Sequence, residues 1–571
     1  MNRKILSILI TLLFASCVQA QDIPITGSDK EGARWTSEKL AERIFNGEQM
    51  TIAQVSKRAP MVEAYIQSLD PEKTPEGLID DAYFLGRTTL DPDSHQRSHL
   101  QLLRPERKQD TPQIRVNTGD RWPLYPDGYV EMLFADVADF DSDHYSLRYA
   151  GAESLGGKMF LRVEVRPLDP KKSGRFLGEI WVDTTSLRIA RIAGTFSPKR
   201  LGFASKYLNA SGISQLGLYF HFESWRQEVS PGIWVPSYTY FDEQRGAGSG
   251  NLATGFHLRG HVWVWGYQGT EIGRAATKLP TSRAELKESG ILASPGQVEL
   301  AMNGIVEELQ RANGITSRSI GCRVLLTSPA EIFSIEDTVF VSRGLLNLVP
   351  NQSVLAALIA REIAHIVPGD SPAQQGTQVT PLKAEPTAES SKVRIQHSGQ
   401  ADANERMLLL LKNTQFVSAA DELESFFASL VLYSRRAPHL MKPLFGGSLL
   451  EQARMQPGVA QPLPAHLATS KAQKLELQGE YGIDSWASQI VRLGGQDLAG
   501  NSLAEATEST RSAPRPPKDN QVRYEGTIPR GQLRTPLHCA RNIGSIMLVT
   551  NLDEQTQLPG ITHHQRQRLP D

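Results

Sequence analysis

The sequence has little cysteine, no excess of charge of one sign and hardly any long apolar run. Among 571 residues there are 3 cysteines, which excludes a disulfide-rich scaffold. Lys+Arg 61 and Asp+Glu 62 nearly cancel, so the chain lacks the basic field that attracts nucleic acid. After the first 20 residues no segment offers the ~20 uninterrupted apolar residues of a transmembrane helix. The sequence also lacks a P-loop, a glycine-rich dinucleotide-binding turn and a GxSxG motif, which argues against nucleotide-dependent and serine-hydrolase chemistry.

The N-terminus carries the pattern of a targeting signal. Arg3 and Lys4 precede an apolar run over 5–15, and residues 18–20 (VQA) are small where a signal peptidase cuts. We therefore expect a signal peptide over 1–20 and export to the periplasm or cell envelope. In the alternative, Cys17 receives a lipid and anchors the protein to a membrane surface.

Cleavage of the signal would leave two cysteines, Cys322 and Cys539. An even number of cysteines in an oxidising compartment favours one disulfide between them. Two separate buried thiols are the alternative, because the sequence does not fix the pairing.

The length predicts more than one domain, and the patterns predict an α+β, multidomain protein. Helix-compatible stretches at 38–44 and 52–67 predict a helical N-terminal region that ends in a linker. Period-two alternation, as in 161–166 (LRVEVR), then predicts a curved antiparallel sheet of six or more strands. Helical periodicity returns after 295. The predicted domains are a signal peptide (1–20), the helical region and linker (21–118), the β domain (119–268), a linker (269–295), a mainly helical domain (296–440) and a partly disordered C-terminal extension (441–571).

The strand spacing of the β domain, with phrases such as 178–183 (GEIWVD), resembles the LolA, LolB and RseB type of envelope domain. The resemblance implies a curved sheet that handles lipoproteins or lipids around a hydrophobic cavity. A sheet whose apolar face is filled by the protein's own helices is the alternative interpretation.

A second motif lies in the helical domain. The phrase 339–346 (VFVSRGLL), followed by the helix 355–366 (LAALIAREIAHI), resembles the HtpX and BepA type of gluzincin zinc metallopeptidase, peptidase family forty-eight. In HExxH, two histidines four residues apart bind zinc from one helix face, and the glutamate acts as general base on the metal-bound water. The resemblance implies a zincin-like fold over 296–440, with Glu362 as vestigial general base and His365 as vestigial second ligand.

The first zinc ligand of that motif is missing, because Arg361 stands in its place. A guanidinium has no acceptor lone pair and does not deprotonate in proteins, so it cannot bind zinc. The resemblance would place the third zinc ligand at Gln400. It would place at position 404 a carboxylate that orients a ligand, and Asn404 stands there. Both residues are therefore amides where the family has carboxylates. A competing alignment puts Val417 and Asp421 there, again without a ligand glutamate.

These observations favour an exported pseudopeptidase that binds polypeptide clients or envelope proteins without cutting them, and that needs no cofactor. One alternative is an active zinc metalloendopeptidase with atypical ligands, such as Asp402. Another is a lipid or lipoprotein carrier that works through the β domain.

Overall fold

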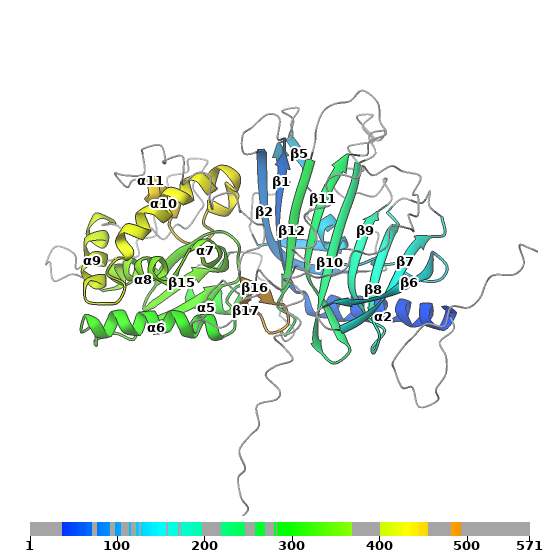
Figure 1. The fold of residues 1–571 in the computed structure, drawn as a ribbon, viewed down its shortest axis with the longest axis horizontal. Coiled ribbons are helices and arrows are strands. Elements are labelled where there is room, and N and C mark those ends of the chain that lie inside the picture. The colour runs from blue at the N-terminus through cyan, green and yellow to red at the C-terminus, as the bar shows by residue number, and fades with distance from the viewer. Residues whose placement is uncertain are drawn as a thin grey trace, which may run out of the picture.

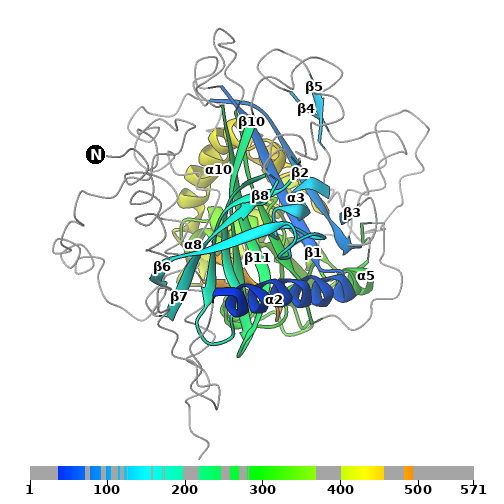
Figure 2. The same ribbon diagram turned by 90° about the vertical axis from the view of Figure 1, so that its right-hand side faces the viewer.

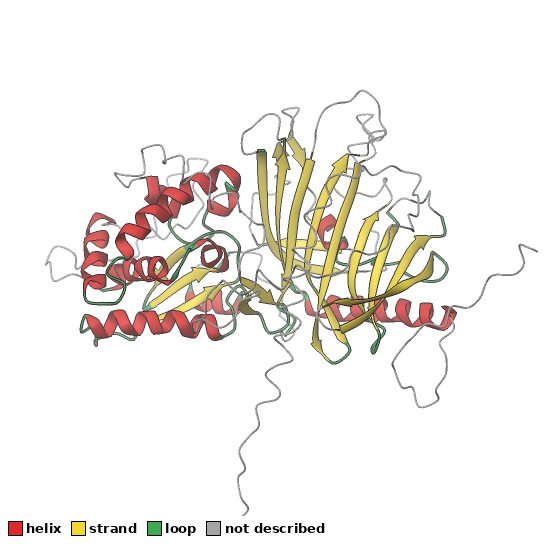
Figure 3. Ribbon diagram, viewed as in Figure 1, coloured by secondary structure: helices red, strands yellow, loops and turns green. Residues whose placement is uncertain are grey.

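The structure is a computed structural model of the 571-residue chain. It describes residues 37–70, 77–91, 98–103, 113–115, 121–124, 127–155, 158–169, 172, 174–196, 218–245, 257–268, 279–280, 282–367, 400–454 and 481–492. The predicted signal peptide, Cys17, Cys539 and most of the predicted C-terminal extension lie outside the described residues. The predicted α+β class is confirmed, since a large antiparallel sheet is followed by a mainly helical region (Figure 3).

The large sheet has ten antiparallel strands in the order β3-β2-β1-β12-β11-β10-β9-β8-β7-β6 (Figure 1). All the neighbouring strands pair antiparallel, as the period-two pattern predicts. The strand bounds are β1 Met61–Leu69, β2 Leu78–Leu90, β3 Ser98–Leu102, β6 Tyr145–Leu155, β7 Lys158–Pro167, β8 Phe176–Asp183, β9 Ile189–Phe196, β10 Leu218–Ser230, β11 Ile233–Arg245 and β12 His257–Trp265. A separate small ribbon pairs β4 Gln113–Arg115 with β5 Arg121–Pro123.

Three strands of this sheet come from the predicted helical region and linker over 21–118. The predicted helix over 52–67 is wrong beyond Arg58, where α2 Ser37–Arg58 ends, and β1 begins at Met61. The strands β1 to β3 therefore belong to the sheet, although they precede the predicted start of the β domain at 119. The division into domains stays a prediction.

The inner face of the sheet is filled by the chain itself. Helix α2 crosses this face (Figure 2), and its Ile44 and Ile52 are buried against strand residues such as Val62. The short helix α3 Asp127–Glu131 and the segment after it add Phe134 and Phe140 to the same core. Of the two interpretations of this face, the described residues match the one in which the protein's own side chains fill it.

The helical region contains a three-stranded sheet in the order β13-β15-β14, in which β13 is parallel and β14 antiparallel to β15. Helices α6, α8, α9 and α10 surround it (Figure 1). The element bounds are α5 Arg283–Glu288, α6 Gln297–Ala312, β13 Gly321–Leu325, β14 Ile332–Ile335, β15 Thr338–Ser342, α7 Arg343–Leu348, α8 Gln352–Ile366, α9 Gln400–Lys412, α10 Ala419–Arg436, the 3-10 helix η4 His439–Met441 and α11 Leu449–Arg454. No helix among the described residues is long and apolar enough to cross a membrane.

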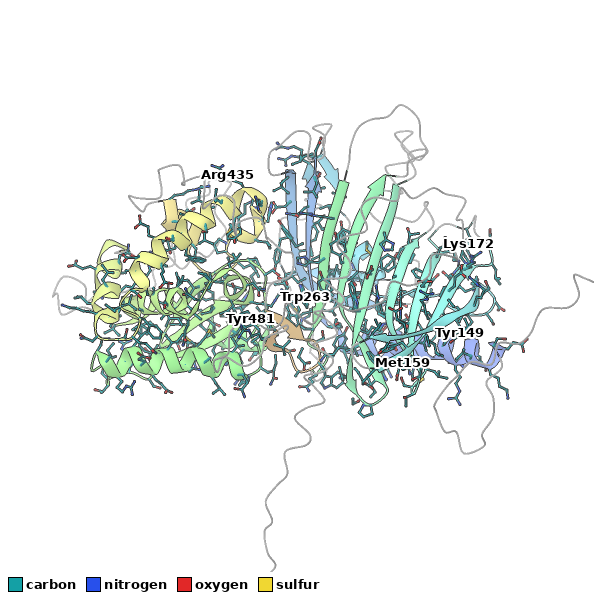
Figure 4. All side chains as sticks on the ribbon, viewed as in Figure 1. Tyr149, Met159, Lys172, Trp263, Arg435 and Tyr481 are labelled. Carbon is teal, nitrogen blue, oxygen red and sulfur yellow. The ribbon has the colours of Figure 1, made fainter. Side chains whose placement is uncertain are left out.

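The outer face of β1 and β12 packs against the helical region, and one buried ion pair crosses this seam. Arg343 donates from Nη2 to Glu63 Oε2 over 2.7 Å, and its guanidinium lies 4.8 Å from the centre of the Trp263 ring. Ser328 donates to the same carboxylate through its backbone N–H (2.5 Å) and its hydroxyl (2.8 Å). Figure 4 labels Trp263 where the two parts meet. The arginine of the VSRGLL phrase therefore joins the helical region to the sheet.

A C-terminal hairpin of β16 Tyr481–Asp484 and β17 Gln489–Arg492 lies in the same seam. Its Ser485 N–H donates to Gln227 of the large sheet over 2.8 Å. On the other side, Ser294 donates from its hydroxyl to the Ala487 carbonyl over 2.6 Å. The hairpin thus bonds to both parts of the molecule.

Candidate functional site

Helix α8 carries three of the predicted site residues and lies in the middle of the helical region. It begins where the Asn351 side chain accepts a hydrogen bond from the Val354 N–H (3.0 Å), as an N-cap residue does. The helix packs against β14, β15, α6, α9 and α10. Because nearly every residue from Val354 to Ile366 is buried, any polar side chain on α8 needs a partner inside the protein.

The Arg361 side chain is inside the protein, at 3% exposure. Its Nη1 donates to Oε1 of Gln452 on α11 over 2.5 Å. Burial lowers the pKa of Arg361, and the neighbouring Glu362 charge raises it in part. A guanidinium in this position offers hydrogen-bond donors and a positive charge, and neither suits a zinc ion.

Glu362 is buried at 5% exposure, and Ser334 of β14 donates from its hydroxyl to Glu362 Oε2 over 3.0 Å. Burial raises the pKa of Glu362 to about 7, although the charge of Arg361 and the bond from Ser334 act in the opposite direction. The carboxyl group therefore holds its proton more tightly than an exposed glutamate does.

The other predicted positions lie on α8 and α9. His365 is half-buried near the end of α8, and Asn404 is half-buried on α9. Gln400 is the first residue of α9, and its side chain lies outside the described residues. The two helices pack together, and Arg406 donates to the Val367 carbonyl over 2.9 Å.

Zinc does not fit the described donors. In the part of the chain that the structure describes, no group of three His, Cys, Asp or Glu side chains could hold a metal ion. In the competing alignment, Val417 is 60% exposed and Asp421 is exposed as well. Those two positions face solvent, which does not suit a ligand for a metal beside buried Glu362.

The sequence does not predict Ser334 and Gln452 as hydrogen-bond partners of Glu362 and Arg361. It also does not predict the contact between segment 440–446 and β14. Glu331, just before β14, accepts hydrogen bonds on Oε2 from the backbone N–H groups of Leu444, Phe445 and Gly446, over 3.0, 2.9 and 3.3 Å. The segment 440–446 therefore lies against β14, the outer strand of the small sheet.

Cys322 lies on β13 and is buried at 1% exposure. Burial, together with the charge of Glu299, raises the pKa of its thiol to about 12. Because Cys539 lies outside the described residues, the Cys322–Cys539 disulfide stays a prediction.

Two hollows lie away from this site. One, of about 410 Å³, lies among the turns at one end of the large sheet, beside Met159 and Gly232. The other, of about 390 Å³, lies between α5 and β13, beside Lys287 and Arg323. Neither is lined by the predicted site residues.

Comparison with known proteins gives only remote similarities. No family model matches the chain, and no curated protein matches it. Among solved structures, a LolA superfamily protein from Nitrosomonas europaea matches at 10% identity over 38% of this chain and 91% of that chain, with a TM-score of 0.21. A putative outer membrane lipoprotein-sorting protein domain from Vibrio parahaemolyticus matches at 9% identity over 39% and 91%, with a TM-score of 0.19. The MucA/MucB complex structure from Pseudomonas aeruginosa matches at 12% identity over 38% and 92%, with a TM-score of 0.12.

With TM-scores this low, these similarities carry no argument about function. The metallopeptidase resemblance rests on the motifs of the second half alone.

Proposed function

We propose that the chain is an exported envelope protein that binds polypeptide, and that its metallopeptidase-like region is not catalytic. The observation that carries the proposal is the buried Arg361 guanidinium, which is hydrogen-bonded to Gln452 at the position of the first zinc ligand. In a zinc enzyme of this type the metal links the ligand-bearing helices. In this chain the Arg361–Gln452 bond links α8 to α11, so a stable arrangement does not require an ion.

Export is proposed from the signal pattern at the N-terminus, and polypeptide binding from the resemblance to metallopeptidases. Recognition of an extended chain depends on backbone hydrogen bonds and side-chain pockets rather than on zinc. Loss of the metal ligands therefore leaves binding possible while it removes cleavage.

The zinc content of the purified protein tests the proposal. We expect much less than one zinc ion per chain by atomic emission and no cleavage of an unfolded protein. The triple variant Arg361→His, Gln400→Glu, Asn404→Asp supplies three protein donors and a carboxylate to orient one of them, so it should hold about one zinc ion per chain.

The matched control combines Arg361→Met with the same changes at 400 and 404. It removes the guanidinium without adding a histidine donor and should stay nearly free of zinc. The proposal is wrong if the native protein already holds about one zinc ion per chain. It is equally wrong if the native protein cleaves an unfolded substrate and Glu362→Gln abolishes that cleavage, because the active-enzyme alternative then applies.

A further inference from the structure

The two edge strands of the ten-stranded sheet, β3 and β6, differ in what lies beside them. At the β3 end, helix α3 covers the edge, and the Leu100 N–H donates to Asp127 Oδ1 over 2.6 Å. Ser98 donates from its hydroxyl to the Asp127 carbonyl over 3.1 Å. This edge is therefore closed, as edges usually are in proteins that avoid pairing with other chains.

At the other end, no strand pairs with the outer side of β6 over the part of the chain that the structure describes, and helix α2, which crosses the inner face, also contacts β6. Leu168 N–H donates to the His144 carbonyl over 2.8 Å, so 144 and 168 form a hydrogen-bonded pair of the antiparallel ladder. Hydrogen-bonded pairs alternate with non-bonded ones, and the register pairs Leu147 with Val165 and Tyr149 with Val163. The N–H and C=O groups of Leu147 and Tyr149 therefore point away from β7, toward the outside of the sheet.

The side chains along this edge have a definite chemistry. Leu147 and Tyr149 are partly buried and pack against the inner core. Arg148 points to the other face with its side chain 67% exposed, and it shares the Glu164 carboxylate with Arg166. Two arginines on one carboxylate leave a positive charge at the edge. Figure 4 labels Tyr149 at the end of the sheet that is far from the helical region.

The regular part of the edge is short. The ladder shifts between Tyr149 and Gly151, which has a φ of 134°. Such a bulge interrupts pairing, so a strand added to this edge has a regular ladder only over 145–149.

We propose that an extended segment of a partner polypeptide adds a strand to β6 along Tyr145–Tyr149. Its backbone would pair with Leu147 and Tyr149, its apolar side chains would lie beside these two residues, and an acidic side chain would lie beside Arg148. A second copy of this chain fits less well, because antiparallel self-pairing of 145–149 about Leu147 brings the Arg148 side chains of both copies onto one face as diagonal neighbours, and neither copy supplies an acidic side chain opposite them. The inference rests on the proposed function only in that polypeptide is the expected partner, since β6 lies outside the Arg361 site.

The test uses a fluorescein-labelled peptide in which valine and tyrosine alternate with glutamate, and it measures binding to the full chain by fluorescence anisotropy. Leu147→Pro removes one outward N–H, and proline is tolerated at an edge strand when its nitrogen faces solvent. This variant should bind about tenfold more weakly, because a backbone hydrogen bond is lost. The control Leu147→Val keeps the N–H and an apolar side chain and should bind within about twofold of the native chain.

A second test uses a peptide in which alternate backbone nitrogens are methylated. It removes the same hydrogen bonds without changing the protein, so it remains valid even if Leu147→Pro does not fold. The methylated peptide should not bind. The proposal fails if the methylated peptide binds as well as the unmethylated one, if Leu147→Pro and Leu147→Val bind alike, or if no binding occurs at about 1 mM peptide. A concentration-dependent dimer in sedimentation that Leu147→Pro abolishes would instead assign the edge to a second copy. Peptide affinity and zinc content are separate readouts, so either test can fail without the other.

Discussion

At the scale of single residues, the burial of Glu362 gives it an unusual dependence on pH. Its pKa is about 7 in the folded protein, compared with 4.5 for an ordinary glutamate, chiefly because burial disfavours the charged form. The folded protein therefore holds this proton more tightly than the unfolded chain does. The resulting stabilisation is fully present below pH 4.5 and is lost as the pH rises through about 7.

The variant Glu362→Gln should remove this pH dependence. The contribution of Glu362 to the free energy of unfolding should fall by about 3 kcal/mol over that interval. Urea unfolding should be measured near pH 5 and near pH 8. Between these two pH values, the free energy of unfolding should fall more for the native protein than for Glu362→Gln. Glu405→Gln, at an exposed position on α9, is the matched control and should behave like the native protein. Equal pH dependence in native protein and Glu362→Gln would contradict the assignment.

At the scale of elements, the first turn of α7 depends on Gly344. A Cβ at this position would lie 1.7 Å from the Ser328 carbonyl oxygen, and that backbone would have to move. Gly344→Ala should therefore destabilise the protein by about 3 kcal/mol or more, measured by urea unfolding. Gly304 lies exposed within α6, where an added Cβ meets nothing within 4 Å. Gly304→Ala should stabilise by about 0.5–1 kcal/mol, and similar effects from both changes would contradict this account.

The sequence predicts most of the large sheet and the main helices of the second half. The alternation of residue types predicts the sheet that contains β7 to β12, and helical periodicity predicts α6 and α8. The predicted helix over 52–67 extends wrongly into β1, which is buried on both faces. Its polar residues Glu63 and Gln67 bond to Arg343 and to the Arg436 carbonyl, which are far away in the sequence.

For the candidate site, the sequence predicts the chemistry of a residue but not its long-range partners. That Arg361 cannot bind zinc follows from its chemistry alone, so the sequence was sufficient. Its partner Gln452 lies 91 residues away, and Ser334 lies on a strand of only four residues, so neither had a local signal. Long-range partners of buried polar groups appear only once the chain is folded.

At the scale of the whole molecule, the Glu63–Arg343 pair holds the sheet and the helical region together. Both side chains are buried, and Glu63 also accepts hydrogen bonds from Ser328 and from Tyr83 (2.8 Å). Removing one partner of a buried pair leaves a charge without its partner, whereas removing both with apolar residues is often nearly neutral.

Arg343→Met and Glu63→Leu should therefore each lower the free energy of unfolding by about 3–5 kcal/mol. The double variant Glu63→Leu, Arg343→Met should lose clearly less than the sum of the two single losses, because neither charge is left behind. Urea unfolding followed by tryptophan fluorescence measures this, since Trp263 lies against Arg343. The exposed pair Arg318–Asp337 provides the control, and Arg318→Ala should change stability by less than about 1 kcal/mol. If Arg343→Met costs no more than Arg318→Ala, the seam does not depend on this ion pair. Its other contacts, among them the Gln67–Arg436 hydrogen bond, the Asp81–His439 pair and the hairpin β16–β17, then hold the two parts together.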